Sequence, residues 1–147
     1  MTGIDLTREM LDALRAKFPD KNIALTEGDY FMIPLGDKKY DAAVSFQTMH
    51  HFSHGKKLTL YRKIRKALRD SGVYLECDYM VEDPKEEEMY LLENRRLREE
   101  AGASQDEYYH YDTPFTIEHQ KSLLLEAGFA KVDLLFRQEN TTLLRAE

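Results

Sequence analysis

The sequence has 147 residues, the size of one domain, and is long enough to bury a core of its own. Hydrophobic residues make up 42% and charged residues 33%, and the net charge at pH 7 is −6. This acidic balance disfavours nucleic acid and anionic membrane surfaces as partners, since both repel a negatively charged protein. No apolar run approaches the roughly 20 residues of a membrane-spanning helix. The single cysteine, Cys77, excludes an intrachain disulfide and favours a cytoplasmic location.

Short strand patterns alternate with helical patterns over the first half of the chain. They predict strands over residues 2–5, 23–26, 41–46 and 73–78, and helices over residues 8–18 and 57–69. Such alternation is typical of a mostly parallel, Rossmann-like α/β sheet with helices on both faces.

The stretch from Tyr40 to Phe52 carries the strongest functional signal. Its first half, 41–46, is small, β-branched and aromatic, which predicts a central strand buried on both faces. Its second half, 47–51, turns polar before a helix begins. Because ligands of open α/β sheets bind beyond the carboxyl ends of parallel strands, we expect the functional site here.

The second half of the chain begins with an interruption of the alternation. Residues 84–113 predict a lid-like insertion, a charged helix followed by an aromatic run, within a single domain of residues 1–147. Thr116 is expected to cap a helix over 117–127, and two closely spaced strands, 131–136 and 141–145, predict an antiparallel hairpin.

Basic residues cluster between positions 56 and 69. They are Lys56, Lys57, Arg62, Lys63, Arg65, Lys66 and Arg69. At helical spacing they indicate a solvated helix face rather than a nucleic-acid patch.

Six segments occur in a fixed order: GID, EGDY, YDAAVSFQTMHHF, SGVYLECDY, the segment from FT to LLLEAGF, and the terminal hairpin. In this order they resemble the class I S-adenosylmethionine-dependent methyltransferases. The resemblance implies a seven-stranded sheet with one antiparallel strand at an edge. It also implies methyl transfer from S-adenosylmethionine to an acceptor, which we expect to be a small molecule.

The same resemblance implies the cofactor-binding residues. Asp5 would accept hydrogen bonds from the two ribose hydroxyls, which a carboxylate at a strand tip does well. An acid preceding a helix N-terminus is the alternative for Asp5. Asp29 would accept from the adenine amino group. The remaining implied contacts are Leu6, Gly28, Tyr30, Phe46 and Gln47.

The implied catalytic residue is His50, which would either take a proton from the acceptor or only shape the pocket. On the acceptor side the resemblance places His51, Tyr79, Tyr109 and Tyr111, the tyrosines either selecting the acceptor or packing the lid. We expect no metal site at His50, His51 and His54, because adjacent histidines usually point apart and no matched carboxylate is evident.

The glycine-rich loop that follows the family's first strand has no counterpart in the sequence. We therefore expect the chain to be an N-terminally truncated domain without that strand, whose unpaired edges favour a homodimer or larger assembly. Three readings stay open: a methyltransferase, a non-catalytic remnant acting as an association module, and an NAD-type Rossmann protein.

Overall fold

The computed structural model describes residues 1–103 and 111–147. The chain divides into two compact units, Met1–Leu35 and Gly36–Glu147. None of the helices that the structure describes is long and apolar enough to cross a membrane.

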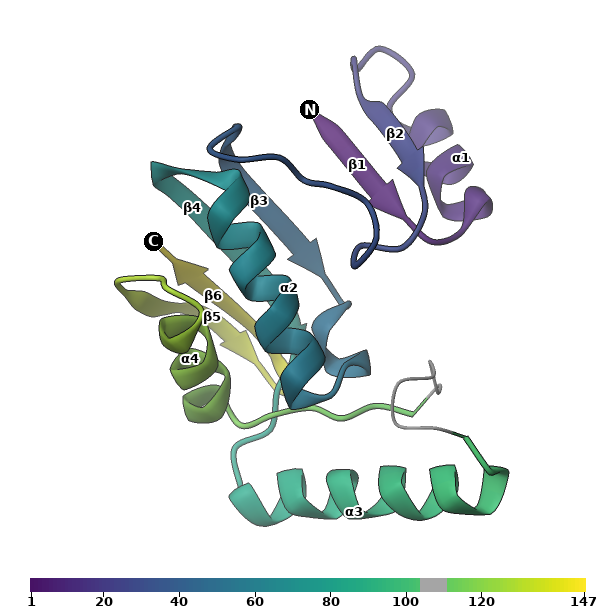
Figure 1. Cartoon of the computed structure of the whole chain (residues 1–147), viewed down its shortest axis with the longest axis vertical. Helices are drawn as coiled ribbons and strands as arrows, with labels where there is room; N and C mark the ends of the chain where they lie inside the picture. Colours follow the sequence, from purple (N-terminus) through teal and green to yellow (C-terminus); the bar gives the residue numbers. More distant parts are fainter. Residues whose placement is uncertain (104–110) are drawn as a thin grey trace. The chain divides into compact units, whose positions relative to one another are not determined.

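The first unit is a strand–helix–strand motif (Figure 1). β1 (Thr2–Asp5) pairs in parallel with β2 (Ala24–Glu27), and α1 (Arg8–Lys17) connects them. The helix buries Leu11 but leaves Met10 60% exposed, although both belong to its apolar stripe. Parallel pairing places the carboxyl ends of both strands at the same edge of the sheet.

The second unit contains a four-stranded sheet in the order β3-β4-β6-β5. Its strands are β3 (Tyr40–Phe46), β4 (Leu68–Tyr79), β5 (Val132–Gln138) and β6 (Thr141–Ala146). β3 is parallel to β4, and β6 is antiparallel to both β4 and β5. The predicted α/β class and terminal hairpin are confirmed. The antiparallel strand lies between β4 and β5 and not at an edge.

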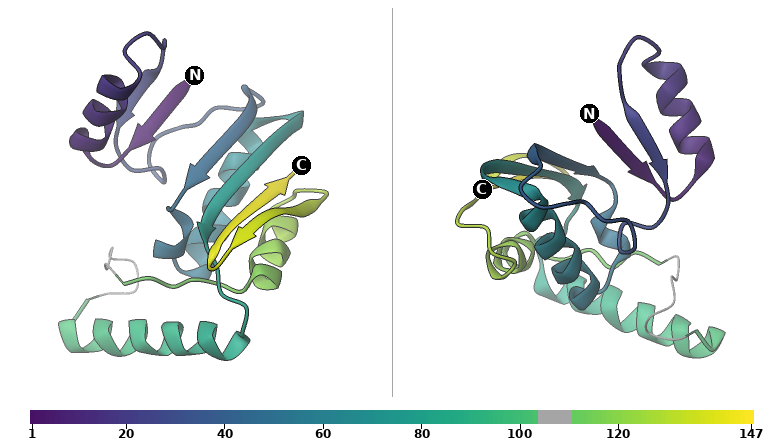
Figure 2. Two further views of the ribbon diagram at one scale, coloured as in Figure 1. Left: turned by 180° about the vertical axis from the view of Figure 1, so that it is seen from behind. Right: turned by 45° about the horizontal axis from the view of Figure 1, so that its top comes forward.

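Two helices, α2 (His54–Ala67) and α4 (Ile117–Glu126), lie on one face of this sheet (Figures 1 and 2). Tyr74 and Leu144 point into the core beneath them and are fully buried. On β3, Val44 is 71% and Phe46 68% exposed. The prediction of a central strand buried on both faces is therefore wrong, because β3 is one of the two edge strands of the sheet in this unit.

The helix α2 begins and ends earlier than the sequence predicts. It starts at His54 and gives way directly to β4 at Leu68, so Ser71 and Gly72, a pair that typically ends a helix, lie in the strand instead. Lys57, expected on a solvated face, is 1% exposed. That expectation is wrong for Lys57, whose Nζ donates to the Thr113 carbonyl at 3.1 Å and lies over the Phe115 ring.

The predicted charged helix is α3 (Pro84–Ala101), and both of its ends are capped. Asp83 accepts from the Lys85 N–H, and Gly102 ends the helix with a φ of 65°, which glycine adopts without strain. Thr116 caps α4 as predicted, its hydroxyl accepting from the His119 N–H at 3.2 Å. A short 3-10 helix, η1 (Met49–His51), follows β3.

Candidate active site

Asp78, near the carboxyl end of β4, organises the turn that follows β3. Phe46 and Cys77 are partners in the parallel register, so the two strands end side by side. The Asp78 carboxylate accepts from the N–H groups of Thr48 at 3.1 Å and Met49 at 2.6 Å. Its other oxygen accepts from the Tyr79 N–H at 2.7 Å. Three backbone donors on one buried carboxylate fix the start of η1 against the end of β4.

His50 lies in η1 and is hydrogen-bonded to Asp78 through Nδ1. The ring is buried, with 6% of the residue exposed. Burial alone raises the pKa of Asp78, but the hydrogen bond and charge of His50 and the backbone N–H donors outweigh it and hold that pKa below its usual value. An ionised Asp78 accepts the Nδ1–H and leaves Nε2 of His50 as the basic nitrogen.

Thr113 joins the end of the segment 84–113 to the turn that contains His50 and His51. Its N–H donates to the His50 carbonyl at 2.6 Å, and its hydroxyl is 3.2 Å from the Phe52 carbonyl. The neighbouring Asp112 is thereby held 3.1 Å from Nδ1 of His51 and 3.7 Å from Nε2 of His50. The two imidazole centroids are 3.9 Å apart. Both premises against a metal site, diverging rings and no matched carboxylate, are wrong.

A row of tyrosines extends from His50 along α3. Tyr79 contacts His50 edge-on at 6.2 Å, its hydroxyl is 2.8 Å from that of Tyr90, and Tyr90 lies 6.3 Å from Tyr111. Burial, and secondarily the hydrogen bond with Tyr90, raises the pKa of Tyr79 to about 12. Burial also raises the pKa of Tyr111. Tyr109 lies outside the described residues.

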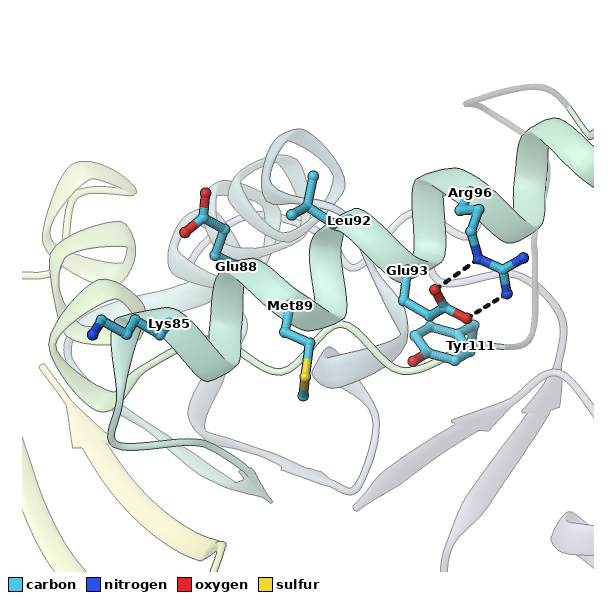
Figure 3. Close-up of a pocket in the computed structure, with 7 residues that line it drawn as sticks. All are labelled: Lys85, Glu88, Met89, Leu92, Glu93, Arg96 and Tyr111. Carbon is cyan, nitrogen blue, oxygen red and sulfur yellow. Dashed lines mark hydrogen bonds and ion pairs between the residues drawn. The ribbon is translucent and has the colours of Figure 1, made fainter.

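Tyr111 also lines an open cavity of about 620 Å³ along α3 (Figure 3). Met89 and Leu92 give it an apolar wall, and both are more than half exposed. Glu93 and Arg96 form an ion pair beside the Tyr111 ring. The cavity therefore lies on a solvent-exposed side of α3, and Tyr111 links it to the tyrosine row.

In the first unit the structure brings Asp5 and Gly28 together. The Gly28 N–H donates to the Asp5 carbonyl at 2.9 Å. One Asp5 oxygen accepts from the N–H of Thr7 at 2.8 Å and from its hydroxyl at 2.9 Å. Gly28 has a φ of 152°, and a Cβ there would lie 2.7 Å from Ile33 Cδ1. A glycine is therefore required in this turn.

The other predicted cofactor contacts are less enclosed. Asp29 accepts from the Phe31 N–H at 2.8 Å, and Leu6 is 57% exposed. Tyr30 is half-buried in the same unit. In the second unit the Gln47 N–H donates to the Cys77 carbonyl at 2.9 Å, in a backbone with a φ of 49°.

Comparison with known proteins identifies the fold. The profile of a family described as "Methyltransferase domain" matches residues 1–72. The structure of PigF with SAH superposes with a TM-score of 0.69 at 21% identity, over 100% of this chain and 43% of that one. The chain has the fold of a class I S-adenosylmethionine-dependent methyltransferase.

Two further methyltransferase structures superpose in the same way. Human N-acetylserotonin methyltransferase in complex with SAM gives a TM-score of 0.67 at 21% identity, over 99% of this chain and 39% of that one. An O-methyltransferase family 2 protein from Planctomyces limnophilus in complex with apigenin gives a TM-score of 0.73 at 17% identity, over 99% of this chain and 42% of that one. The chain thus spans about two fifths of the length of these methyltransferases. No curated protein matches the chain.

Three residues of the candidate site are not predicted from the sequence. Asp78 ends the strand beside β3, so its place at a carboxyl strand end was a usable signal. Asp112 and Tyr90 lie in the segment 84–113, and nothing in their local sequence indicates that Thr113 and Tyr79 hold them near His50.

Proposed function

We propose that the chain forms the methyl-transfer site of an S-adenosylmethionine-dependent methyltransferase that acts on a small molecule. The buried hydrogen bond between His50 and Asp78 carries this proposal, because it is a base with an orienting carboxylate at the carboxyl ends of two parallel strands.

The chemistry needs little beyond positioning and a proton acceptor. Bound S-adenosylmethionine would supply an electrophilic methyl group for in-line transfer to a nucleophilic oxygen or nitrogen of the acceptor, with the carbon–sulfur bond breaking and the sulfonium becoming a neutral thioether. Nε2 of His50 takes the proton that the nucleophile loses. The ionised Asp78 stabilises the resulting imidazolium through Nδ1–H.

Ribose and adenine contacts are proposed for residues of the first unit, and further cofactor contacts are proposed separately for Phe46 and Gln47 at the end of β3. Asp5 and Gly28 lie together at the ends of two paired strands, which supports their roles at the ribose and adenine. PigF and human N-acetylserotonin methyltransferase, which share the fold, are described with SAH and SAM. We propose S-adenosylmethionine as the cofactor of this chain as well.

The acceptor side is proposed to be formed by His51 and by Tyr79 and Tyr111, with Tyr109 expected beside them. A row of aromatic rings next to the base favours a flat acceptor that carries a hydroxyl or amine. The Planctomyces protein, described with the flavone apigenin, is a fold relative with a ligand of that kind.

Calorimetric titration with S-adenosylmethionine and with its demethylated product tests the cofactor proposal. Asp5→Ala should weaken binding at least tenfold, because the ribose hydroxyls lose a charged acceptor. Asp12→Ala, which removes an exposed carboxylate of α1, is the matched control and should bind like the wild type. Absence of wild-type binding at millimolar ligand would reject the cofactor proposal.

Transfer of a labelled methyl group to a panel of phenols and amines tests the role of His50. We expect His50→Gln to lower the rate about 100-fold or more with cofactor affinity unchanged. His54→Gln is the control, since His54 contacts Phe115 and His119 instead of Asp78. Equal rates for both variants would contradict a proton-accepting role.

The association module is the second candidate, and the exposed edge strand favours it. β3 ends the four-stranded sheet and carries Val44 and Phe46 largely exposed, which suits pairing with a second copy of this chain. Light scattering during gel filtration should then give a dimer that Val44→Lys dissociates. A wild-type monomer would contradict this proposal. A cytoplasmic location is also proposed, since Cys77 is a free thiol.

A further inference from the structure

Three potential metal ligands converge beside the proposed base. His50, His51 and Asp112 each offer one atom, and these atoms lie within 4.8 Å of one another. Among the described residues this is the one such group of three. His50 is buried and the other two are half-buried, so the cluster faces solvent on one side.

Two of the three distances between these atoms are close to those of a tetrahedral site. Two ligand atoms about 2.1 Å from a tetrahedral zinc ion are about 3.4 Å apart. Asp112 Oδ1 is 3.1 Å from Nδ1 of His51 and 3.7 Å from Nε2 of His50, so the observed distances lie on either side of that value. Nδ1 of His51 is hydrogen-bonded to Oδ1 of Asp112, and a bound ion would replace the hydrogen of that bond.

The surroundings of His50 are those of a metal-binding histidine. Ligand histidines donate their second ring N–H to a carboxylate, which fixes the ring and raises its basicity. Nδ1 of His50 is bonded to Asp78, and Asp78 is itself held by three backbone N–H groups. Thr113 fixes Asp112 by its bonds to the His50 and Phe52 carbonyls.

We propose that His50, His51 and Asp112 bind one divalent transition-metal ion of the zinc class. Two imidazoles and one carboxylate match the donor preference of zinc and leave a fourth position for water. The ion occupies Nε2 of His50, so metal binding and proton acceptance by His50 exclude each other. Metal binding itself does not depend on the proposed methyl transfer.

Titration of the untagged full chain with Zn²⁺ by calorimetry, and with Co²⁺ by visible absorption, tests the proposal. We expect one equivalent of each ion, with the intense absorption of four-coordinate Co²⁺. His51→Gln and Asp112→Asn should each weaken Zn²⁺ binding at least tenfold. Both side chains are partly exposed, so both variants should fold, which circular dichroism checks.

Two control variants exclude other ligands. His119→Gln removes a histidine that is also paired with a carboxylate, that of Glu87, and Cys77→Ser removes the single thiol. Both should bind Zn²⁺ like the wild type. Absence of binding at millimolar Zn²⁺, or binding that His51→Gln and Asp112→Asn leave unchanged, would overturn the proposal.

Discussion

At the scale of single residues, Asp78 combines a structural and a chemical role. Its carboxylate satisfies three backbone N–H groups and orients His50. The same contacts that orient the proposed base also hold η1 in place. Stability and proton transfer should therefore respond together to changes at this residue.

Asp78→Asn should lower the free energy of unfolding by about 1–3 kcal/mol, because uncharged acceptors replace charge-assisted ones in a buried site. The pKa of Asp78 is depressed by folding, so its contribution is present above the unfolded pKa and is lost as pH falls through the folded value. Urea titrations between pH 7 and pH 3 should show the difference from wild type shrinking with acidity.

The matched control is Asp41→Asn, which alters an exposed carboxylate of β3 that pairs with Arg69. Surface ion pairs contribute about 0–1 kcal/mol, so this variant should unfold almost like the wild type. Equal losses in the two variants would contradict the role assigned to Asp78.

The sequence predicts those residues of the site that lie at the carboxyl end of a strand. His50 and Asp78 both lie near the carboxyl ends of two parallel neighbouring strands, and that position predicts His50. Asp112 reaches the site through hydrogen bonds between Thr113 and the His50–Phe52 turn, 61 to 63 residues away in the sequence. Tertiary contacts of this kind leave no local pattern.

At the scale of helices and strands, side-chain capping distinguishes α4 from α2. The Thr116 hydroxyl accepts from the His119 N–H, whereas Ser53, at the same position before α2, makes no side-chain cap hydrogen bond. Thr116 is also buried, and its own N–H donates to Glu87 at 2.6 Å. The cap thus joins the start of α4 to α3.

Thr116→Ala should lower the free energy of unfolding by about 1 kcal/mol, the usual value of an N-cap hydrogen bond. Ser53→Ala is the control and should have a smaller effect, since no cap bond is lost. Chemical denaturation followed by circular dichroism measures both. A larger loss in Ser53→Ala would contradict the assignment of these caps.

The capped ends of α3 and α4 were predictable, and the end of α2 was not. These ends depend on local backbone geometry and on residue types that typically cap helices, namely Asp83, Gly102 and Thr116. After Ala67, pairing of Leu68 with Tyr40 starts β4 and ends α2 before Ser71 and Gly72. Long-range pairing overrides a local stop signal there.

At the scale of the second unit as a whole, charged and polar side chains are buried between the sheet and its helices. Glu76 is fully buried and accepts from the Tyr61 hydroxyl at 3.0 Å and from Gln120. Its second oxygen has no hydrogen-bond partner among the described residues. Lys57 is buried in the same region, so the core contains two groups whose charged forms folding disfavours.

Burial raises the pKa of Glu76 to about 7, and the negative charge of Asp78 adds to this increase. Burial lowers the pKa of Lys57 to about 8, although the negative charge of Glu76 acts in the opposite direction. Between pH 4.5 and 7 the folded chain holds a proton on Glu76 that the unfolded chain has lost, so stability falls as pH rises. Between pH 8 and 10.5 the unfolded chain holds a proton that folded Lys57 has lost, so stability rises with pH.

The free energy of unfolding should therefore pass through a minimum between pH 7 and 8, after a fall on the order of 1–3 kcal/mol from its value near pH 4.5. Glu76→Gln should remove the falling limb and Lys57→Met the rising one. Lys66→Met, at an exposed position of α2, is the control and should keep both limbs. Urea titrations across this pH range measure the profiles. If the wild-type profile runs parallel to that of Glu76→Gln up to pH 7, the pKa of Glu76 is not raised by folding. The burial of Glu76 then makes no pH-dependent contribution to the free energy of unfolding, which would contradict this prediction.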